Sequence, residues 1–157
     1  MSKATRATQA LEKAKIAFSV HGYEYDPGAE RVGLQAAEAL GERPDRVLKT
    51  LMALVDGKPV CVIVPSDREV SMKKLAAAFD GKSAAMMKPS DAERLSGYKV
   101  GGISPFGQMR MLRTAIEQQA VVHPYVYLNG GQRGLQVKLA PQDAVSLLGM
   151  IVAPLVA

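Results

Sequence analysis

The sequence predicts one mixed α+β domain. Two apolar runs, Leu48 to Val55 and Val60 to Pro65, flank Asp56-Gly57, a dipeptide typical of tight hairpin turns because both turn residues need positive φ. Elsewhere, segments patterned as helices and as strands interleave irregularly, which argues against a strict βαβ repeat. At 157 residues, of which 48% are hydrophobic and 22% charged, the chain can bury about two-thirds of its unfolded surface in one core. We therefore expect a single domain over residues 1–157.

Helical spacing and helix stops place the elements of the first part of the chain. Alanine and leucine recurring at helical spacing predict an amphipathic helix through Lys15, and a strand is expected from Phe18 to Tyr25. Alanine-rich Leu34 to Leu40 predicts a second helix, which Gly41 ends. A short turn is expected next, from Pro44 to Val47.

Capping residues and glycine stops place three further helices. They are expected from Ser71 to Phe79, ending at Gly81; from a capping box of Ser90 and Glu93 to Gly97; and from Pro141 to Gly149. Between the helix that ends at Gly97 and the helix that begins at Pro141, we expect a glycine-rich loop at 101–107, a strand at 122–128, a loop at 129–134 and a strand at 135–139.

The positive charge of the chain is concentrated towards its C-terminus. Of the formal net charge of +5, residues 94–157 carry +4, with six Lys or Arg against two Asp or Glu. A phosphate-rich partner is the functional interpretation of such a bias, and an ordinary solvated surface is the alternative. We expect an anionic partner to bind this part of the chain.

Nothing in the sequence indicates export or membrane insertion. Residues up to Lys15 carry charges without an apolar segment, and the charge-free run from Ala144 to Ala157 is shorter than the ~18 apolar residues of a membrane span. The single cysteine, Cys61, cannot form an internal disulfide, which fits a reducing compartment. We therefore expect a cytosolic protein without membrane contact.

Motifs of cofactor and metal enzymes are missing from the sequence. It has no GxxxxGK[ST], GxGxxG, HExxH or paired CxxC segment, so no nucleotide cofactor or metal ion is expected. His21 and His123 both fall in expected strands, where packed or surface roles are commoner than catalysis. Cys61 alternates with apolar neighbours and is expected to be a buried small hydrophobe rather than a nucleophile.

The segment from Gly102 to Gly107 is only superficially similar to a nucleophile elbow. Its spacing is one residue longer than GxSxG, and Pro105, which follows Ser104, lacks the N–H that the elbow's oxyanion hole uses. Ser104 is therefore expected to form a turn rather than to attack a substrate.

Lys49 and two glycine pairs are the candidate functional residues. Both alternating sets of Leu48 to Val55 are mostly apolar, which predicts a strand covered on both faces. Lys49 must then find an acceptor, unless the strand starts at Thr50 and the lysine reaches solvent. Gly101-Gly102 and Gly130-Gly131 let backbone approach a ligand and present N–H donors, although glycine pairs are also ordinary turn formers.

Three motifs follow one another in an order that covers essentially the whole chain. They are Lys49-Thr50-Leu51, Gly101-Gly102-Ile103-Ser104-Pro105-Phe106-Gly107 and Gly130-Gly131-Gln132-Arg133-Gly134-Leu135, with His21-Gly22-Tyr23 and Pro44-Asp45 upstream. In this order they resemble the YbaK family of Cys-tRNA(Pro) deacylases. The resemblance implies a mostly antiparallel, barrel-like sheet with flanking helices, in a free-standing relative of the editing domain of prolyl-tRNA synthetase. It implies removal of cysteine from tRNA(Pro) in trans, with the aminoacyl-tRNA 3′ end as ligand, prolyl-tRNA synthetase as a candidate partner, and no cofactor, metal ion or DNA.

The resemblance also implies roles for individual residues. Lys49, Gly101 and Gly102 are implied as catalytic, because a cation and backbone donors would surround the ester while the substrate's own thiol attacks it. The implied substrate-binding residues are Tyr23, Thr50, Ile103, Ser104, Pro105, Asn129, Gly130, Gly131, Arg133 and Gln136.

Two positions depart from the cysteine-specific members of that family. Asn129 and Gln136 stand where those members have serine and aspartate, whereas Tyr23 matches a pocket tyrosine. Both amides can form hydrogen bonds, but the charge of the aspartate is lost. Three hypotheses follow: a Cys-tRNA(Pro) deacylase, a deacylase for another small amino acid such as alanine, and a non-catalytic module that binds tRNA or a synthetase. In each, the expected contacts to tRNA phosphates are Arg110, Arg113, Arg133 and Lys138.

Overall fold

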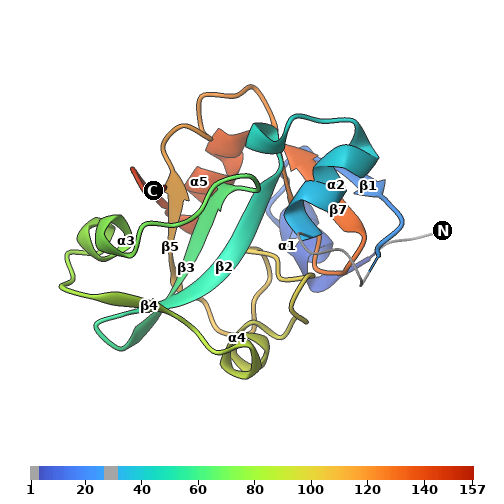
Figure 1. The fold of residues 1–157 in the computed structure, drawn as a ribbon. Helices are drawn as coiled ribbons and strands as arrows, with labels where there is room; N and C mark the ends of the chain where they lie inside the picture. The colour runs from blue at the N-terminus through green and yellow to red at the C-terminus, as the bar shows by residue number, and fades with distance from the viewer. Residues whose placement is uncertain (1–3, 27–31) are drawn as a thin grey trace.

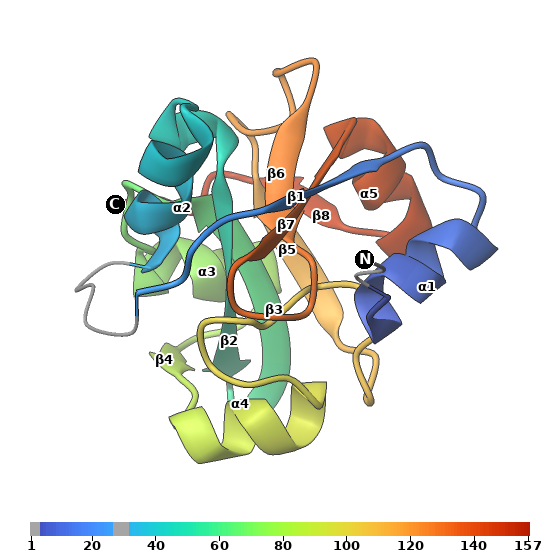
Figure 2. The ribbon, with the colours of Figure 1, turned by 90° about the vertical axis from the view of Figure 1, so that its right-hand side faces the viewer.

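Two β-sheets form the centre of the fold in the computed structural model, which describes residues 4–26 and 32–157. A five-stranded mixed sheet has the order β4-β2-β3-β5-β8, and a three-stranded antiparallel sheet has the order β1-β7-β6. Figures 1 and 2 show the smaller sheet lying against one face of the larger sheet. The strands are β1 (Ser19–Gly22), β2 (Leu48–Val55), β3 (Lys58–Pro65), β4 (Ala84–Met86), β5 (Arg113–Glu117), β6 (Val126–Asn129), β7 (Leu135–Leu139) and β8 (Ile151–Ala153).

Short helices surround the sheets, and α3 lies on the side of the large sheet away from α1 and α2 (Figure 1). The helices are α1 (Arg6–Lys13), α2 (Val32–Leu40), the 3-10 turn η1 (Pro44–Arg46), α3 (Met72–Ala78), α4 (Pro89–Ser96) and α5 (Pro141–Leu148). Within the described ranges, no helix has the length and apolar character that a bilayer span requires. The mixed α+β class predicted from the sequence is confirmed.

The predicted hairpin is confirmed. β2 and β3 pair antiparallel along their whole length, and the turn residues Asp56 and Gly57 have φ values of 51° and 79°. Positive φ at both central residues is the signature of the tight turn whose twist matches that of the flanking strands.

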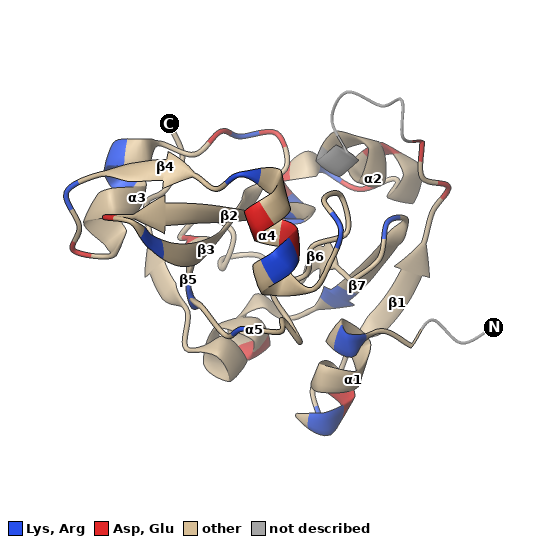
Figure 3. Cartoon of the chain, turned by 90° about the horizontal axis from the view of Figure 1, so that it is seen from below, with Lys and Arg blue, Asp and Glu red and all other residues tan. Residues whose placement is uncertain are grey.

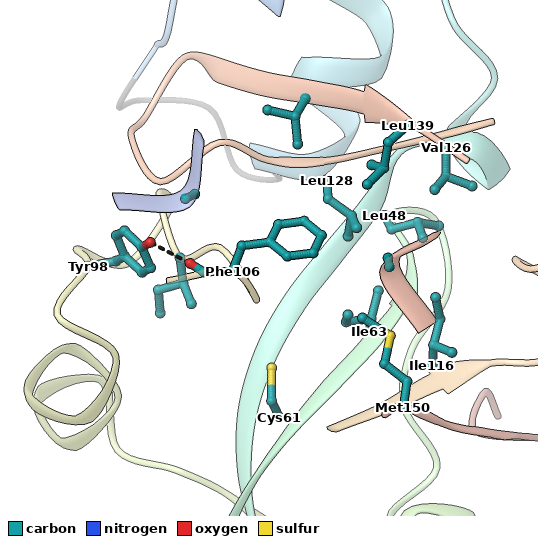
Figure 4. Packing of buried hydrophobic residues seen from close by; sticks show 14 of the residues in the cluster. Leu48, Cys61, Ile63, Tyr98, Phe106, Ile116, Val126, Leu128, Leu139 and Met150 are labelled. Carbon is teal, nitrogen blue, oxygen red and sulfur yellow. Dashed lines mark hydrogen bonds between the residues drawn. The ribbon is translucent and has the colours of Figure 1, made fainter. Parts of the chain in front are cut away.

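The large sheet is buried on both faces. The main core lies between the two sheets and includes Ile63, Phe106 and Leu128, all fully buried (Figure 4). A second core lies on the other face of the large sheet, against α3. β2 contributes Met52 to the first core and Ala53 to the second, so the predicted coverage of this strand on both faces is confirmed.

Two expected strands are shorter than predicted. β1 covers only Ser19–Gly22, and β6 begins at Val126 rather than at Val122, which is 76% exposed. Pro124 explains the later start of β6 because proline has no N–H to donate to a sheet ladder. His123 therefore lies in a turn, and its expected place in a strand is wrong.

Two helix ends also differ from prediction. Pro89 is the first residue of α4 and Lys88 is its N-cap without a side-chain hydrogen bond, so the capping box predicted for Ser90 is wrong. The carboxylate of Glu93 instead accepts a hydrogen bond from the Val100 N–H at 2.8 Å. After α3, the left-handed residue is Asp80. Gly81 is required for a different reason, since a Cβ there would lie 2.4 Å from the Val55 side chain.

Candidate functional site

A pocket of about 540 Å³ opens where the two sheets diverge. Val47, which precedes β2 and lines the pocket, bridges to Tyr127 of the small sheet. Its apolar wall is formed by Val47, Leu48, Leu51, Met52, Met86, Met87, Pro89, Ala92, Val100 and Ile103. The other lining residues are Tyr25, Lys49, Thr50, Ser66, Glu69, Gly101, Asn129, Arg133 and Gln136.

β2 presents part of its edge to this pocket. β4 pairs with residues 53–55 of β2, and just beyond them the Met87 N–H donates to the Met52 carbonyl. Successive residues of an antiparallel strand direct their backbone groups to opposite edges, so Thr50 directs its N–H and C=O to the same edge as Met52. Because Thr50 lines the pocket, we infer that these two backbone groups are directed towards a ligand there.

Lys49 lies within β2, opposite Val64 of β3. The strand begins at Leu48, so the alternative in which it starts at Thr50 is wrong. The lysine side chain is 23% exposed, and its Nζ lies 3.8 Å from Oε1 of Glu69. The sequence required an acceptor for a lysine in a covered strand, and the structure provides this carboxylate as an ion-pair partner, beyond hydrogen-bond distance.

Asn129 connects the two glycine loops. Its Oδ1 accepts hydrogen bonds from the N–H groups of Gly131 at 2.7 Å and Gln132 at 3.2 Å, and its Nδ2 donates to the Gly101 carbonyl at 3.2 Å. The side chain is buried, with 8% exposed. Asn129 therefore sets the spacing between the loops, and both ends of its amide are used within the protein.

Three of the four paired glycines also use their N–H groups within the protein. The Gly102 N–H donates to the Lys99 carbonyl and the Gly130 N–H to the Leu135 carbonyl, each at 2.8 Å, while Gly131 bonds to Asn129. The expected role of these three glycines as donors to a ligand is therefore wrong. Gly102 serves close packing instead, because a Cβ there would lie 2.8 Å from the backbone nitrogen of Arg133.

Two polar atoms in the pocket wall have no hydrogen-bond partner among the described residues. They are Oγ1 of Thr50 and Oε1 of Gln136, whose residue is 5% exposed. Burial raises the pKa of Tyr23, and the neighbouring side chain of Gln136 opposes part of this rise. Both oxygens are buried from solvent, so they add polar atoms to this wall beneath its accessible surface.

Comparison with known proteins identifies the family. The sequence profile of the aminoacyl-tRNA editing domain matches residues 27–147. The chain belongs to the aminoacyl-tRNA editing domain family. A relative from Enterococcus faecalis, provisionally named Cys-tRNA(Pro)/Cys-tRNA(Cys) deacylase EbsC, is 31% identical over 145 residues, which are 91% of this chain and 87% of the relative. This membership supports an aminoacyl-tRNA deacylase activity and confirms the resemblance found in the motifs.

Solved structures share the fold of this editing domain. A protein provisionally described as a trans-editing enzyme for prolyl tRNA synthetase superimposes with a TM-score of 0.82 at 21% identity, covering 99% of each chain. A hypothetical protein, APE2540, superimposes with a TM-score of 0.85 at 20% identity, covering 98% of this chain and all of the other. The arrangement of two sheets and short helices is therefore that of known editing-type structures.

The structure brings seven of the predicted site residues to the pocket of the editing domain. They are Lys49, Thr50, Gly101, Ile103, Asn129, Arg133 and Gln136. Tyr23 does not line the pocket, but its side chain interacts with that of Gln136, which does. Gly102 and Gly131 line a smaller neighbouring cavity of about 300 Å³, and Gly130 supports the loop.

Ser104 and Pro105 lie outside the pocket lining. Both are buried, and the Ser104 Oγ accepts a hydrogen bond from the Phe106 N–H at 3.2 Å. The predicted turn role of Ser104 is confirmed, whereas the implied contact of Ser104 and Pro105 with substrate is not supported. Ser104 is fully buried and Pro105 is also buried, and neither is part of the pocket lining.

The sequence did not indicate Glu69, Met86 or Met87 as pocket residues. Glu69 follows β3 in a connecting segment, and Met86 and Met87 come from β4 and the residue after it. No spacing or motif links these residues to Lys49, because they reach the pocket only through the pairing of β2 with its neighbours. A carboxylate near Lys49 was foreseeable only in the general sense that the lysine needed an acceptor.

Cys61 and the two histidines do not line the pocket. Cys61 is 1% exposed, and burial raises the pKa of its thiol to about 12. Neither His21 nor His123 lines the pocket; His21 contacts Ser19, and His123 lies 3.8 Å from Asp45. In the described ranges, no group of three or more His, Cys, Asp or Glu side chains is arranged to hold a metal ion. The predicted burial of Cys61 is confirmed.

The four predicted phosphate contacts are dispersed over the editing domain. Arg133 lines the pocket. The guanidinium of Arg113 lies 5.0 Å from the ring centroid of Phe79, and the ammonium of Lys138 lies 4.1 Å from the ring centroid of Tyr125. Figure 3 shows basic residues on several elements, including α1, α4 and β7, rather than in one patch. Their contact with tRNA stays a prediction.

Proposed function

We propose that this editing domain removes cysteine from mischarged tRNA(Pro) in trans, in the cytosol. The observation that carries the proposal is a pocket that combines the Lys49 cation and an open backbone edge at Thr50, while no cysteine or histidine of the described residues lines it. Such a site can bind and polarise an ester but has no strong nucleophile of its own. The names of EbsC and of the trans-editing enzyme support tRNA(Pro) as the substrate.

The proposed reaction uses the substrate's own sulfur. The thiol of the misattached cysteine attacks its ester carbon, so that a C–S bond forms while the bond from this carbon to the ribose oxygen breaks. The thiol proton ends on the ribose oxygen, which leaves as a free hydroxyl of tRNA. The amino acid leaves as a cyclic thioester, which water then opens. The burial of Cys61 is consistent with this scheme, because the reacting sulfur comes from the ligand.

The protein contributes positioning and charge. The Lys49 ammonium and the Thr50 N–H stabilise the negative oxygen that develops on the ester carbonyl, and a single fixed donor of this kind is worth about 3 to 4 kcal/mol. The apolar wall, which includes Met52, Met87 and Ile103, excludes water from one side of the ester. Holding the thiol and the ester carbon in such a geometry favours the conformation from which the intramolecular attack occurs.

A second candidate is removal of another small amino acid, such as alanine. The observation that favours it is Gln136, a neutral amide with an unpaired oxygen in the pocket wall, where cysteine-specific members have a carboxylate. A neutral amide supplies hydrogen bonds but no charge to activate a thiol. For alanine, water would attack the ester in place of the thiol.

Release of amino acid from purified charged tRNAs tests both candidates. The chain is incubated with Cys-, Ala- and Pro-tRNA(Pro), each with and without prolyl-tRNA synthetase. Faster release from Cys-tRNA(Pro) than from the other two supports the proposal, and faster release from Ala-tRNA(Pro) supports the second candidate. A requirement for added synthetase would identify that enzyme as a partner. Binding of tRNA without release of any amino acid would contradict both and indicate a non-catalytic module.

A further inference from the structure

We infer that Glu69 binds the free α-ammonium group of the aminoacyl ester, so that the pocket selects unblocked aminoacyl ends over N-acylated ones. The inference rests on the proposed function, since it concerns the ligand of the same pocket. An aminoacyl ester carries an amine next to the bond that is broken, and this amine is the only cationic group common to all such esters.

The charges that line the pocket match this ligand. Glu69 is the one carboxylate among the described residues of the lining, which also contains the cations Lys49 and Arg133. The 3′ end of an aminoacyl-tRNA combines negative phosphodiesters with a single ammonium. Cations alone would attract the phosphodiesters but repel the ammonium, so a carboxylate in the lining serves the amine.

The distance between Glu69 and Lys49 fits the geometry of the ester. Oε1 of Glu69 lies 3.8 Å from Nζ of Lys49. In an aminoacyl group the amine nitrogen and the carbonyl carbon are separated by two bonds, or about 2.5 Å. A carboxylate that binds the ammonium therefore leaves Lys49 beside the carbonyl oxygen, and the pair holds both ends of the reacting unit.

The main chain of Glu69 is held in place by the C-terminal segment. The Ala157 N–H donates to the Glu69 carbonyl at 2.9 Å, and the Ser71 N–H donates to the Leu155 carbonyl at 2.8 Å. Glu117, which is 1% exposed, accepts the Leu155 N–H at 2.8 Å. The Glu69 side chain is 71% exposed at the rim of the pocket, so an incoming ligand reaches it while its backbone stays fixed.

A purely structural role for Glu69 has a different consequence. If the carboxylate only orients Lys49, its removal weakens every ligand of the pocket to the same extent, whatever the state of the amine. If it binds the ammonium, its removal weakens only the ligand with a free amine. Acetylation of the amine removes its charge and separates the two roles.

The test measures binding of an acceptor-stem minihelix of tRNA(Pro) that carries alanine through a non-hydrolysable 3′-amide, with the amine free or acetylated. We expect the wild-type chain to bind the free-amine form roughly fivefold more tightly, the upper range for an ion pair with an exposed partner. Glu69→Gln should bind the two forms equally. The matched control Asp67→Asn changes an exposed acid outside the pocket lining and should keep the preference.

Equal binding of the two forms by the wild-type chain, or an unchanged preference in Glu69→Gln, would overturn the inference. Failure of the proposed function has a separate signature. The chain would then release no amino acid from charged tRNA, although its preference for the free-amine minihelix persists.

Discussion

Replacing Lys49 by alanine removes one of the two cations that line the pocket within residues 4–26 and 32–157, while its strand stays in place. Lys49 takes part in the β2–β3 ladder through its backbone, opposite Val64, and its side chain makes an ion pair with the exposed Glu69. Ion pairs with an exposed partner contribute at most about 1 kcal/mol to stability. The variant should therefore fold normally.

The expected loss of activity follows from the charge that Lys49 faces. Two unit charges 4 Å apart interact by about 4 kcal/mol at an effective dielectric constant of 20. Removal of one oxyanion donor lowers rates by roughly 100- to 1000-fold in other enzymes. Because Lys49 is partly exposed and lies 3.8 Å from Glu69, we expect the lower end, a loss of about 100-fold. Lys49→Arg should be nearly as inactive, since a planar guanidinium does not replace a compact ammonium in the same space.

Single-turnover release of amino acid from Cys-tRNA(Pro) at saturating protein isolates the chemical step. Lys58→Ala is the matched control, because Lys58 begins β3 of the same hairpin, is exposed and lies outside the pocket lining. Binding of tRNA should weaken much less than the rate, since one cation makes only one of several phosphate contacts. A Lys49→Ala protein that releases cysteine at the wild-type rate would refute the proposed role of this lysine.

Four further outcomes are expected. Cys61→Ala should keep most of the deacylation activity and lower stability by about 1 to 2 kcal/mol; loss of activity in a variant that is folded by circular dichroism would contradict the substrate-thiol scheme. Burial raises the pKa of Cys61 from 9.0 to about 12, so between these pH values the thiol is protonated in the folded state but ionised in the unfolded state. The free energy of unfolding should therefore fall as the pH rises from 9.0 to about 12. Urea titrations should show a smaller fall for Cys61→Ala. Affinity for tRNA should fall with salt by a log-log slope of roughly 0.7 to 0.9 for each phosphate contact, and each alanine substitution among Arg110, Arg113, Arg133 and Lys138 should reduce the slope; a salt-independent affinity would exclude these contacts. Glu117→Ala should lower the free energy of unfolding by about 3 kcal/mol or more, because two buried backbone N–H groups, of Leu155 and Val156, and the part-buried N–H of Gln119 lose their acceptor; a chemical denaturation midpoint equal to that of the wild type would show that these groups find other partners.

Local chemistry alone determined the hairpin and most helix ends. Asp56-Gly57 forms its turn because both residues take positive φ, and the predicted helix stops at Gly41, Gly97 and Gly149 also have positive φ. The burial of Cys61 and the need of Lys49 for an acceptor followed from alternation within a single strand. These features depend on neighbours within a few residues, so the sequence contains all the information that they require.

Tertiary structure decided the features that join distant segments. The sequence did not indicate the short strands β4, β5 and β8. In the structure β4 pairs with β2, β5 with β3 and β8 with β5, and this pairing makes them strands. Glu69 meets Lys49, and Asn129 meets Gly101, across long stretches of chain. Three of the four glycine N–H groups that the sequence suggested as ligand donors are used by other backbone and side-chain acceptors, and the donor that we propose at the pocket is Thr50 on the edge of β2. Which backbone groups remain available to a ligand depends on how all the strands pair, and no local pattern encodes that pairing.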